Sequence, residues 1–203
     1  MDNAVGLVQA YLRLNGYFTV TEHPVIAMGR DGRYRTATDL DVLAFRFPRA
    51  GRLVPGRGRS GDEEHMVVDK ALNVQADQPD MLVGEVKEGR AVLNDAASDP
   101  GVLRTVLVTF GCCPRADVPR IAKSLLRDGH AVLPDGHHIR TAVFASVTAD
   151  ADTSRHLVIS LGHVVKFLRS YIEEHWEVMR QAESKDPAFG FLMMLAKAER
   201  GDG

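Results

Sequence analysis

The sequence predicts an α/β fold in which a central mixed β-sheet is flanked by helices and followed by a C-terminal helical pair. Three observations support this fold class. Residues 4–15 carry apolar side chains at helical spacing, whereas residues 39–44 and 81–87 are short apolar runs of the length expected for strands. Residues 161–203 contain two further stretches with helical apolar stripes. We therefore expect one α/β domain over residues 1–160 and a helical appendage over residues 161–203.

The first half of the chain is predicted to run helix, strand, turn, strand, strand. Apolar residues give the helix over residues 4–15 one buried face, and Asn15-Gly16 ends it. An extended segment is expected at residues 17–25, before a turn centred on Asp31-Gly32. After the strands over residues 39–44 and 81–87, residues 105–110 are predicted as a further strand.

Capping and turn residues delimit the elements that follow. Asp117 is expected to cap a helix that runs to Asp128 and is closed by a glycine. A Pro-Asp-Gly turn at residues 134–136 precedes a predicted strand over residues 139–147. The polar residues 148–155 are expected to form a loop.

The C-terminal segment differs from the rest in being helical throughout. A long helix is predicted over residues 162–183, and Asp186-Pro187 supplies an N-cap followed by proline for a second helix. The second helix is apolar over more than one face. We therefore expect this pair to pack on the sheet and also to form the surface of a homodimer.

The composition is typical of a globular domain, with 203 residues of which 45% are hydrophobic and 26% charged. No apolar segment is long enough to cross a bilayer and no signal-peptide pattern is present, so we expect a cytoplasmic location without a membrane partner. The net charge of −2 argues against a protein that coats nucleic acid generally. The adjacent Cys112 and Cys113 are predicted to be buried small hydrophobes. His130, His137 and His138 lack a second cluster with zinc-ligand spacing.

Three polar residues next to apolar strands have the chemistry of a divalent-metal site. Asp41 precedes the run Val-Leu-Ala, and Glu85 and Lys87 follow the run Met-Leu-Val-Gly. Because side chains alternate along a strand, Glu85 and Lys87 share one face. If the two strands pair, Asp41 and Glu85 converge on Mg²⁺ or Mn²⁺, which activates water and neutralises phosphate charge. Lys87 would orient or deprotonate the water, or hold the phosphate.

This arrangement resembles the PD-(D/E)xK nuclease superfamily, which has a restriction-endonuclease-like fold. The resemblance covers the first half of the chain, in the order helix, extended segment, Asp41 strand and Glu85-Val86-Lys87 strand. It implies that Asp41, Glu85 and Lys87 are catalytic, that Asp41 and Glu85 hold Mg²⁺ or Mn²⁺, and that Asp39 is an auxiliary ligand on the face of Asp41. Many relatives carry a glutamate in the first helix, whereas this helix contains no acid and only Gln9 is a polar candidate.

A basic segment directly follows the Asp41 strand. It carries five arginines and no acid, interleaved with glycine and proline: Arg46, Arg49, Arg52, Arg57 and Arg59. Guanidinium groups can bind phosphates in a bidentate manner. Two interpretations remain open, a loop that contacts nucleic acid and a solvated linker.

The sequence leads to one preferred function and two alternatives. The preferred function is a metal-dependent nuclease that hydrolyses phosphodiester bonds, in DNA rather than RNA. The first alternative is a nuclease-like module that no longer cleaves and binds nucleic acid or a protein partner. The second is an unrelated α/β domain in which Glu85 and Lys87 merely pair. The separation of Asp41 from Glu85 distinguishes this last interpretation from the others.

Overall fold

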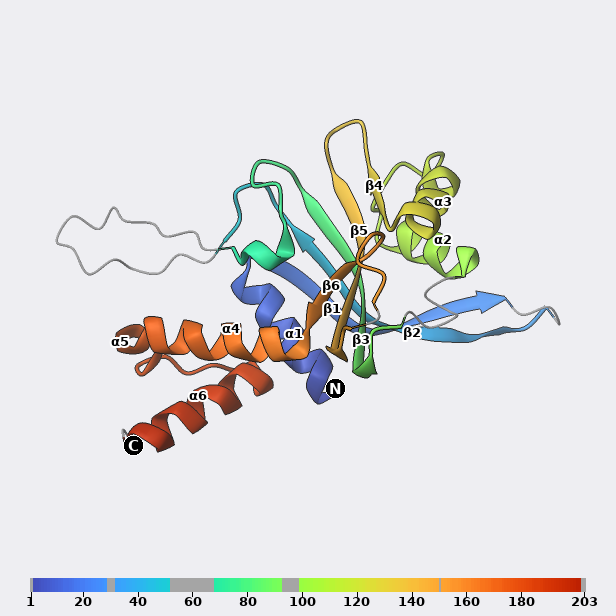
Figure 1. The fold of residues 1–203 in the computed structure, drawn as a ribbon. Helices are drawn as coiled ribbons and strands as arrows, with labels where there is room; N and C mark the ends of the chain where they lie inside the picture. Colours follow the sequence, from blue (N-terminus) through green and yellow to red (C-terminus); the bar gives the residue numbers. More distant parts are fainter. Residues whose placement is uncertain (1, 29–31, 52–67, 93–98, 150, 202–203) are drawn as a thin grey trace.

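The computed structural model describes residues 2–28, 32–51, 68–92, 99–149 and 151–201. Within these ranges six strands form one mixed sheet, and helices lie on both of its faces (Figure 1). The predicted class, an α/β fold with a mixed sheet flanked by helices, is therefore confirmed. The turn predicted at Asp31-Gly32 falls partly outside the described residues, as does most of the basic segment.

The sheet has the strand order β1-β2-β3-β5-β4, and β6 also pairs with β5. Strands β1, β2 and β3 pair antiparallel in succession, β5 runs parallel to β3, and β6 runs parallel to β5. The short β4 pairs antiparallel with the start of β5. The strands are β1 (Tyr17–Met28), β2 (Tyr34–Arg46), β3 (Asp80–Arg90), β4 (His130–Val132), β5 (His138–Val147) and β6 (Leu157–Ser160).

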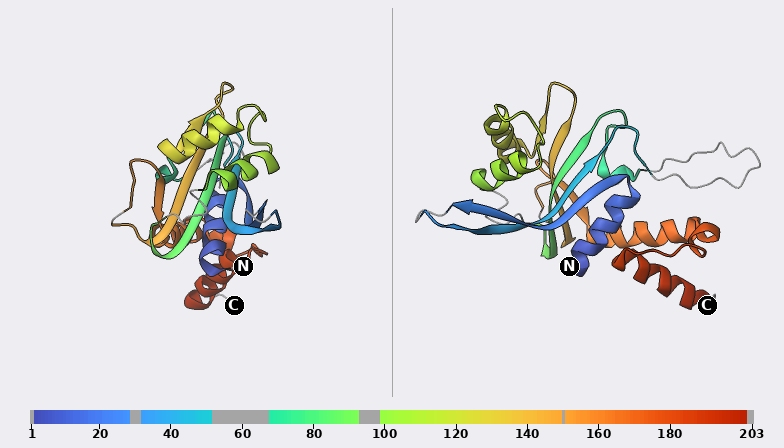
Figure 2. Two further views of the ribbon diagram at one scale, coloured as in Figure 1. Left: turned by 90° about the vertical axis from the view of Figure 1, so that its right-hand side faces the viewer. Right: turned by 180° about the vertical axis from the view of Figure 1, so that it is seen from behind.

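Helices divide the hydrophobic core between the two faces of the sheet. On one face α1 and α4 pack against the sheet together with α6, and on the other face lie α2 and α3 (Figure 2). Alternation along β2 follows this division, because Val42 faces the α1 side and Leu43 the α2 side. The helices are α1 (Asn3–Leu14), α2 (Pro100–Thr109), α3 (Val118–Asp128), α4 (Leu161–Glu174), α5 (Trp176–Met179), α6 (Pro187–Arg200) and the 3₁₀ turn η1 (Lys70–Leu72).

The hairpin of β1 and β2 extends beyond the rest of the sheet. Its two strands pair from Tyr17 and Arg46 out to Met28 and Tyr34, whereas β2 pairs with β3 only from Val42 onward. The outer half of the hairpin therefore projects as a two-stranded arm (Figure 1). Asp41 lies at the position where β2 separates from β3.

The strand predicted over residues 105–110 is wrong, because residues 105–109 belong to helix α2 and Phe110 is its C-cap. Asp99 caps the helix by accepting hydrogen bonds from the Gly101 and Val102 N–H groups, and Pro100 occupies the first turn. The buried residues of α2 recur at helical spacing and pack against α3 and the sheet: Val102, Leu103, Val106 and Leu107. This packing overrides the local preference of a β-branched run.

The helix predicted over residues 162–183 is interrupted. Helix α4 ends at Glu174, and a separate short helix, α5, follows. The second predicted helix is confirmed as α6, because Asp186 accepts hydrogen bonds from the Ala188 and Phe189 N–H groups. Asp117 differs from Asp186 in that its side chain makes no capping hydrogen bond to α3.

A buried ionic cluster links β1, β3 and β5. Arg140 donates from Nε and Nη2 to the two carboxylate oxygens of Asp80 at 2.8 and 2.7 Å, and Tyr17 donates its hydroxyl to the same carboxylate at 2.6 Å. The remaining Nη1 of Arg140 donates to the Leu72 carbonyl oxygen at 2.9 Å. Asp80 is 3% exposed, so this cluster fixes the start of β3 from inside the fold.

None of the helices in the described ranges has both the length and the hydropathy needed to cross a membrane.

Candidate active site

Asp41 is held between two strands by a hydrogen bond to backbone. Its Oδ2 accepts the Val86 N–H at 2.8 Å, so the carboxylate of β2 takes the place of a backbone partner for β3. The side chain is half-buried, and it lies at the base of the projecting arm because β2 pairs with β3 only from Val42 onward. The predicted pairing of the Asp41 strand with the Glu85 strand is therefore present, and it places Asp41 next to the Glu85-Val86-Lys87 segment.

Glu85 and Lys87 lie on one face of β3, as alternation requires. The Lys87 ammonium donates to Oε1 of Glu85, while Val86 between them packs into the core beneath α1. Glu85 is buried and 4% exposed, whereas the Lys87 side chain is 32% exposed. The lysine therefore connects a buried carboxylate to solvent.

The electrostatics show that the three groups form one cluster. Burial raises the pKa of Glu85, and the charge of Asp41 raises it further, while Lys87 lowers it. Burial also raises the pKa of Asp41, and the Val86 N–H and the Lys87 charge lower it. A carboxylate whose ionisation is opposed by a neighbouring carboxylate marks a location where an added cation is stabilised.

Two further acidic residues lie close enough to Asp41 to affect its pKa. Asp39, which is exposed, raises the pKa of Asp41 through its charge, and so does Asp2. Asp2 is the N-cap of α1, where it accepts hydrogen bonds from the Ala4 and Val5 N–H groups. Sequence reasoning included Asp39 and missed Asp2, although an aspartate directly before a helical apolar pattern is a recognisable N-cap signal.

Glu22 of β1 is a second acid that the sequence did not single out. Its neighbours Thr21 and His23 pair with Val42 and Leu40, so Glu22 lies opposite Asp41 in the hairpin. It has a φ of +50°, which non-glycine residues rarely adopt, and its Oε1 accepts the Asp2 N–H at 2.8 Å. A backbone irregularity of this kind leaves no signal in the sequence.

Gln9 does not take the place of a helix glutamate at this site. It is 6% exposed, and its Nε2 donates to the Thr21 hydroxyl at 3.3 Å. Its hydrogen bond therefore joins α1 to β1. The acidic residue that the α1 region contributes is Asp2, the N-cap of the helix.

The donor set suits an ion that retains water. Within the described residues, no group of three or more His, Cys, Asp or Glu side chains has the spacing of a preformed metal site. Mg²⁺ usually binds through one or two carboxylates together with waters and substrate phosphates. Asp41 and Glu85 fit that requirement, with Asp39 as an outlying acid.

The predicted nucleic-acid-binding arginines occupy different environments. Arg46 is the last residue of β2 and only 2% exposed, and its Nη2 donates to the Ala50 carbonyl oxygen, so its guanidinium lies inside the fold. Arg49 is exposed and pairs with Asp77 at 2.9 Å. Arg52, Arg57 and Arg59 lie outside the described residues.

No protein-family model, curated protein or solved structure matches this chain. The functional assignment therefore rests on the residues of the site themselves.

Proposed function

We propose that this protein is a metal-dependent nuclease of the PD-(D/E)xK type that hydrolyses phosphodiester bonds, in DNA rather than RNA. The observation that carries the proposal is the cluster at the base of the arm: half-buried Asp41 on β2, and buried Glu85 with Lys87 on β3. An unrelated domain in which Glu85 and Lys87 merely pair would have no reason to place a second carboxylate next to them. The cost of burying like charges together is typical of functional sites.

The order of elements also supports the proposed restriction-endonuclease-like fold. Helix α1 and strand β1 are followed by the Asp41 strand and then by the Glu-x-Lys strand, and the three strands are neighbours in one sheet. This is the order on which the resemblance in sequence rests.

The residues have separable roles in the proposed reaction. Asp41 and Glu85 would hold Mg²⁺ or Mn²⁺, with Asp39 as an auxiliary ligand, and the ion when bound supplies charge neutralisation and an acidified water. The Val86 N–H orients the carboxylate of Asp41. Lys87, which is paired with Glu85 and partly exposed, would hold a phosphate oxygen through its ammonium.

Arginines of the basic segment would supply contacts to the nucleic-acid backbone. Arg49 is exposed, and we propose that Arg52, Arg57 and Arg59 act with it. Phosphate contacts position a nucleic acid and carry no sequence information by themselves. Loss of one such arginine should therefore weaken binding to all sequences about equally.

The direct test is cleavage of labelled linear, single-stranded and branched DNA, and of matched RNA, with Mg²⁺ or Mn²⁺. We expect Asp41→Asn, Glu85→Gln and Lys87→Ala each to lower cleavage by at least about a hundredfold, the size of effect produced by removing one strong electrostatic group. Glu177→Gln is a matched control, because Glu177 is an exposed carboxylate on α5 that pairs with Arg180. Cleavage that survives in all three site variants would show that the site is assigned wrongly.

A module that binds without cleaving is the second candidate. It is favoured by the absence of an acid in the interior of α1 and by the commitment of Gln9 to Thr21. On this proposal the wild-type chain binds nucleic acid or a protein partner, and neither Mg²⁺ nor Mn²⁺ produces cleavage of any substrate in the panel.

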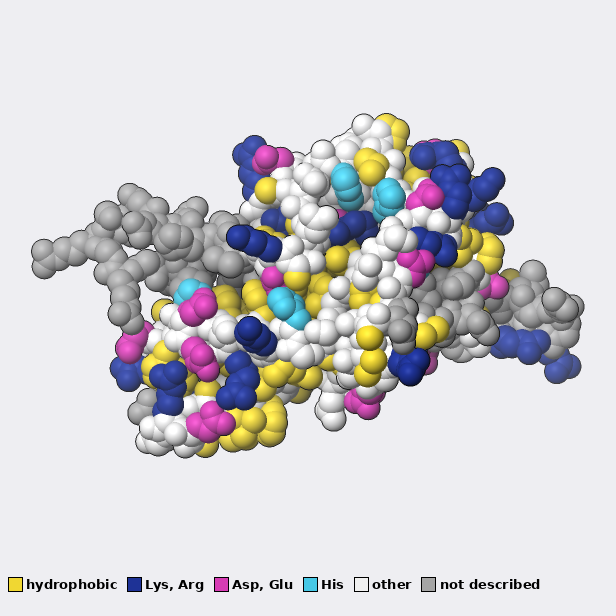
Figure 3. Space-filling view, in the orientation of Figure 1, with side chains coloured by type: hydrophobic (Ala, Val, Ile, Leu, Met, Phe, Trp, Pro, Cys, Tyr) yellow, Lys and Arg dark blue, Asp and Glu magenta, His cyan; other side chains and the backbone are white. Residues whose placement is uncertain are grey.

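We also propose that the chain forms a homodimer through its C-terminal helices. Phe191, Met194 and Leu195 of α6 are 56%, 50% and 38% exposed, and hydrophobic side chains gather over this helix (Figure 3). Sedimentation should give twice the chain mass for wild type and the single-chain mass for Phe191→Glu. Lys197→Glu, at a half-buried polar residue of α6, is the control for added negative charge. A wild-type chain that sediments as a monomer at all concentrations would exclude this surface as a dimer interface.

A further inference from the structure

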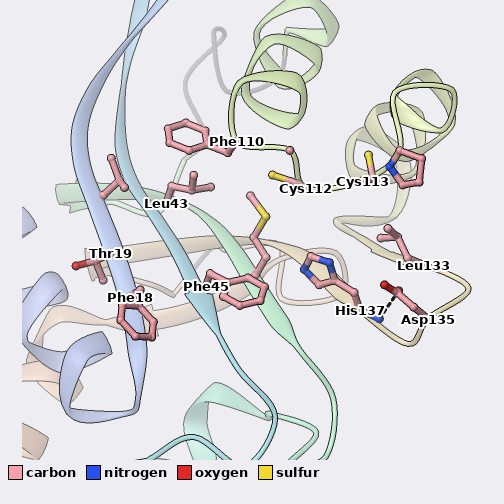
Figure 4. A pocket seen from close by; sticks show the side chains of 14 residues that line it. Phe18, Thr19, Leu43, Phe45, Phe110, Cys112, Cys113, Leu133, Asp135 and His137 are labelled. Carbon is pink, nitrogen blue, oxygen red and sulfur yellow. Dashed lines mark hydrogen bonds between the residues drawn. The ribbon is translucent and has the colours of Figure 1, made fainter.

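An apolar pocket of about 640 Å³ lies on the α2 side of the sheet, apart from Asp41, Glu85 and Lys87. Its floor is formed by β1, β2 and β3, and its walls by the connection between α2 and α3 and by the turn before β5 (Figure 4). Binding pockets for small molecules usually measure about 300–1,000 Å³, so this pocket is large enough for a ligand of that class.

Three phenylalanine rings take part in the lining of the pocket. Phe18, Phe45 and Phe110 contribute their side chains, together with Met81 and Leu43. Phe18 is 67% exposed and Phe45 is half-buried, so these rings remain accessible from solvent. Exposed rings on a rigid sheet can stack against a planar ligand, and each stacked base contributes about 1–3 kcal/mol in single-stranded nucleic-acid complexes.

His137 supplies the polar element of the pocket. Its side chain points into the pocket next to Phe45, and the two rings meet edge to face with centroids 5.5 Å apart (Figure 4). The residue is only 8% exposed, and its Nε2 has no hydrogen-bond partner among the described residues. A buried ring nitrogen without a partner costs free energy, which a ligand with a complementary polar edge would recover.

The charge around His137 defines which edge would be complementary. Burial lowers the pKa of His137, so its ring is neutral near pH 7 and one ring nitrogen is an acceptor. Asp135, also in the lining, accepts the backbone N–H of His137 through Oδ1 at 3.1 Å and adds a carboxylate at the rim. The Asp135 carboxylate favours a ligand that presents an N–H donor, and Nε2 of the neutral ring donates or accepts according to its tautomer. An aliphatic chain would leave Nε2 unpaired.

Exposed basic residues lie on α3 and on the connection that leads from the pocket into it. Pro114 is part of the lining, and the exposed Arg115 follows it directly. Arg120 and Lys123 are exposed on α3 itself, and basic side chains gather over this helix (Figure 3). Arg120 is partly compensated by Asp117 at 3.3 Å. A phosphate attached to a ring bound in the pocket would meet this positive surface.

We propose that this pocket binds a nucleotide, with the base stacked on Phe18 and Phe45, its polar edge hydrogen-bonded to His137 and its phosphate next to Arg115. The base could come from a free nucleotide or from an unstacked nucleotide of a single strand, because both present the same ring and phosphate. This pocket is a site additional to the proposed nuclease centre, and its occupation does not depend on cleavage.

The test is titration of the full-length chain with adenosine, guanosine, cytidine and uridine and with their 5′-monophosphates, followed by calorimetry and ligand-detected NMR. We expect saturable binding of at least one monophosphate with a Kd below about 1 mM, which corresponds to about −4 kcal/mol. Phe18→Ala and His137→Leu should each weaken binding by at least about fivefold. Arg115→Ala should weaken binding of the monophosphate and leave the nucleoside unchanged.

Controls separate this proposal from loss of fold and from the nuclease proposal. Phe191→Ala removes a similarly exposed ring on α6 and should bind as wild type does. Asp41→Asn should also bind as wild type does, even when its cleavage is lost. His137→Leu keeps the volume of the side chain, so its thermal unfolding should match or exceed that of wild type.

The source of the base is identified by competition. A short single-stranded oligonucleotide that displaces the monophosphate, while its abasic counterpart does not, would assign the pocket to a strand. Displacement by neither would assign it to free nucleotides. The proposal is overturned if no nucleotide saturates the chain, if Phe18→Ala and His137→Leu leave the affinity unchanged, or if toluene competes for the pocket and nucleotides do not.

Discussion

Strand β3 carries two buried carboxylates in different electrostatic environments. Asp80, at its start, is 3% exposed and receives two N–H groups from Arg140 and the hydroxyl of Tyr17. Glu85, further along the same strand, is 4% exposed. It accepts a hydrogen bond from Lys87, and it lies near a second carboxylate, that of Asp41. Burial is therefore equal at the two positions, and the neighbouring charges distinguish them.

The difference separates a structural cluster from a site prepared for a ligand. A buried ion is tolerated when cations and hydrogen-bond donors surround it, as they do around Asp80. At Glu85 burial raises the pKa and the charge of a second carboxylate raises it further, so the cluster is stabilised when additional positive charge arrives. The first cluster should matter for folding and the second for chemistry.

The largest effect expected from this comparison is loss of stability on breaking the Asp80 cluster. Arg140→Leu leaves the Asp80 carboxylate buried with Tyr17 as a donor, and removal of one partner of a buried pair costs about 3–5 kcal/mol. Denaturant unfolding measures this cost directly. Arg180→Leu breaks the exposed pair with Glu177 and should cost no more than about 1 kcal/mol. Equal costs for the two variants would show that burial does not distinguish these pairs.

A smaller effect of opposite sign is expected at the second cluster. Asp41→Asn removes a carboxylate whose pKa burial raises, and the amide oxygen of asparagine can still accept the Val86 N–H. The variant should therefore be more stable than wild type at neutral pH by about 0.5–1 kcal/mol while losing cleavage. Thermal unfolding checks this, and a destabilisation above about 1 kcal/mol would mean that Asp41 is chiefly structural.

The gain from Asp41→Asn should depend on pH in a defined direction. Asp41 has a raised pKa in the folded protein. Below its ordinary pKa the group is protonated in both the folded and the unfolded chain and does not affect stability. As pH rises from the ordinary pKa through the raised value, the wild-type protein loses stability. The variant lacks this loss. Its advantage over wild type should therefore be absent below about pH 3.8, the ordinary value for aspartate, and reach a plateau at neutral pH.

The sequence was sufficient where one local pattern determined one element. Alternation placed Glu85 and Lys87 on one face, and Asp186-Pro187 marked the start of α6. It failed at residues 105–110, where a β-branched run lies in helix α2 because Asp99 caps it and its apolar residues face α3. Local β-propensity could not reveal that tertiary context.

Features that depend on contacts between distant segments were not predictable. The cluster of Asp80 with Arg140 and Tyr17 joins residues from three strands, and nothing in the local sequence around any of them indicates the others. The same holds for the burial of Arg46, which a basic, glycine-rich neighbourhood suggested would be exposed. Charge patterns along a chain therefore predict composition of a surface better than they predict individual contacts.

The smallest effect defines the boundary of the site at Asp39. This residue is exposed and acts on Asp41 through its charge, unlike Glu85, which is buried. An exposed charge interaction contributes about 0.5 kcal/mol, so Asp39→Asn should lower cleavage only about twofold and leave thermal unfolding unchanged. Cleavage rates measured across a Mg²⁺ titration would show a small rise in the concentration needed for half-maximal activity. A loss as large as that of Asp41→Asn would instead make Asp39 a principal ligand rather than an auxiliary one, and the site would then extend onto the arm.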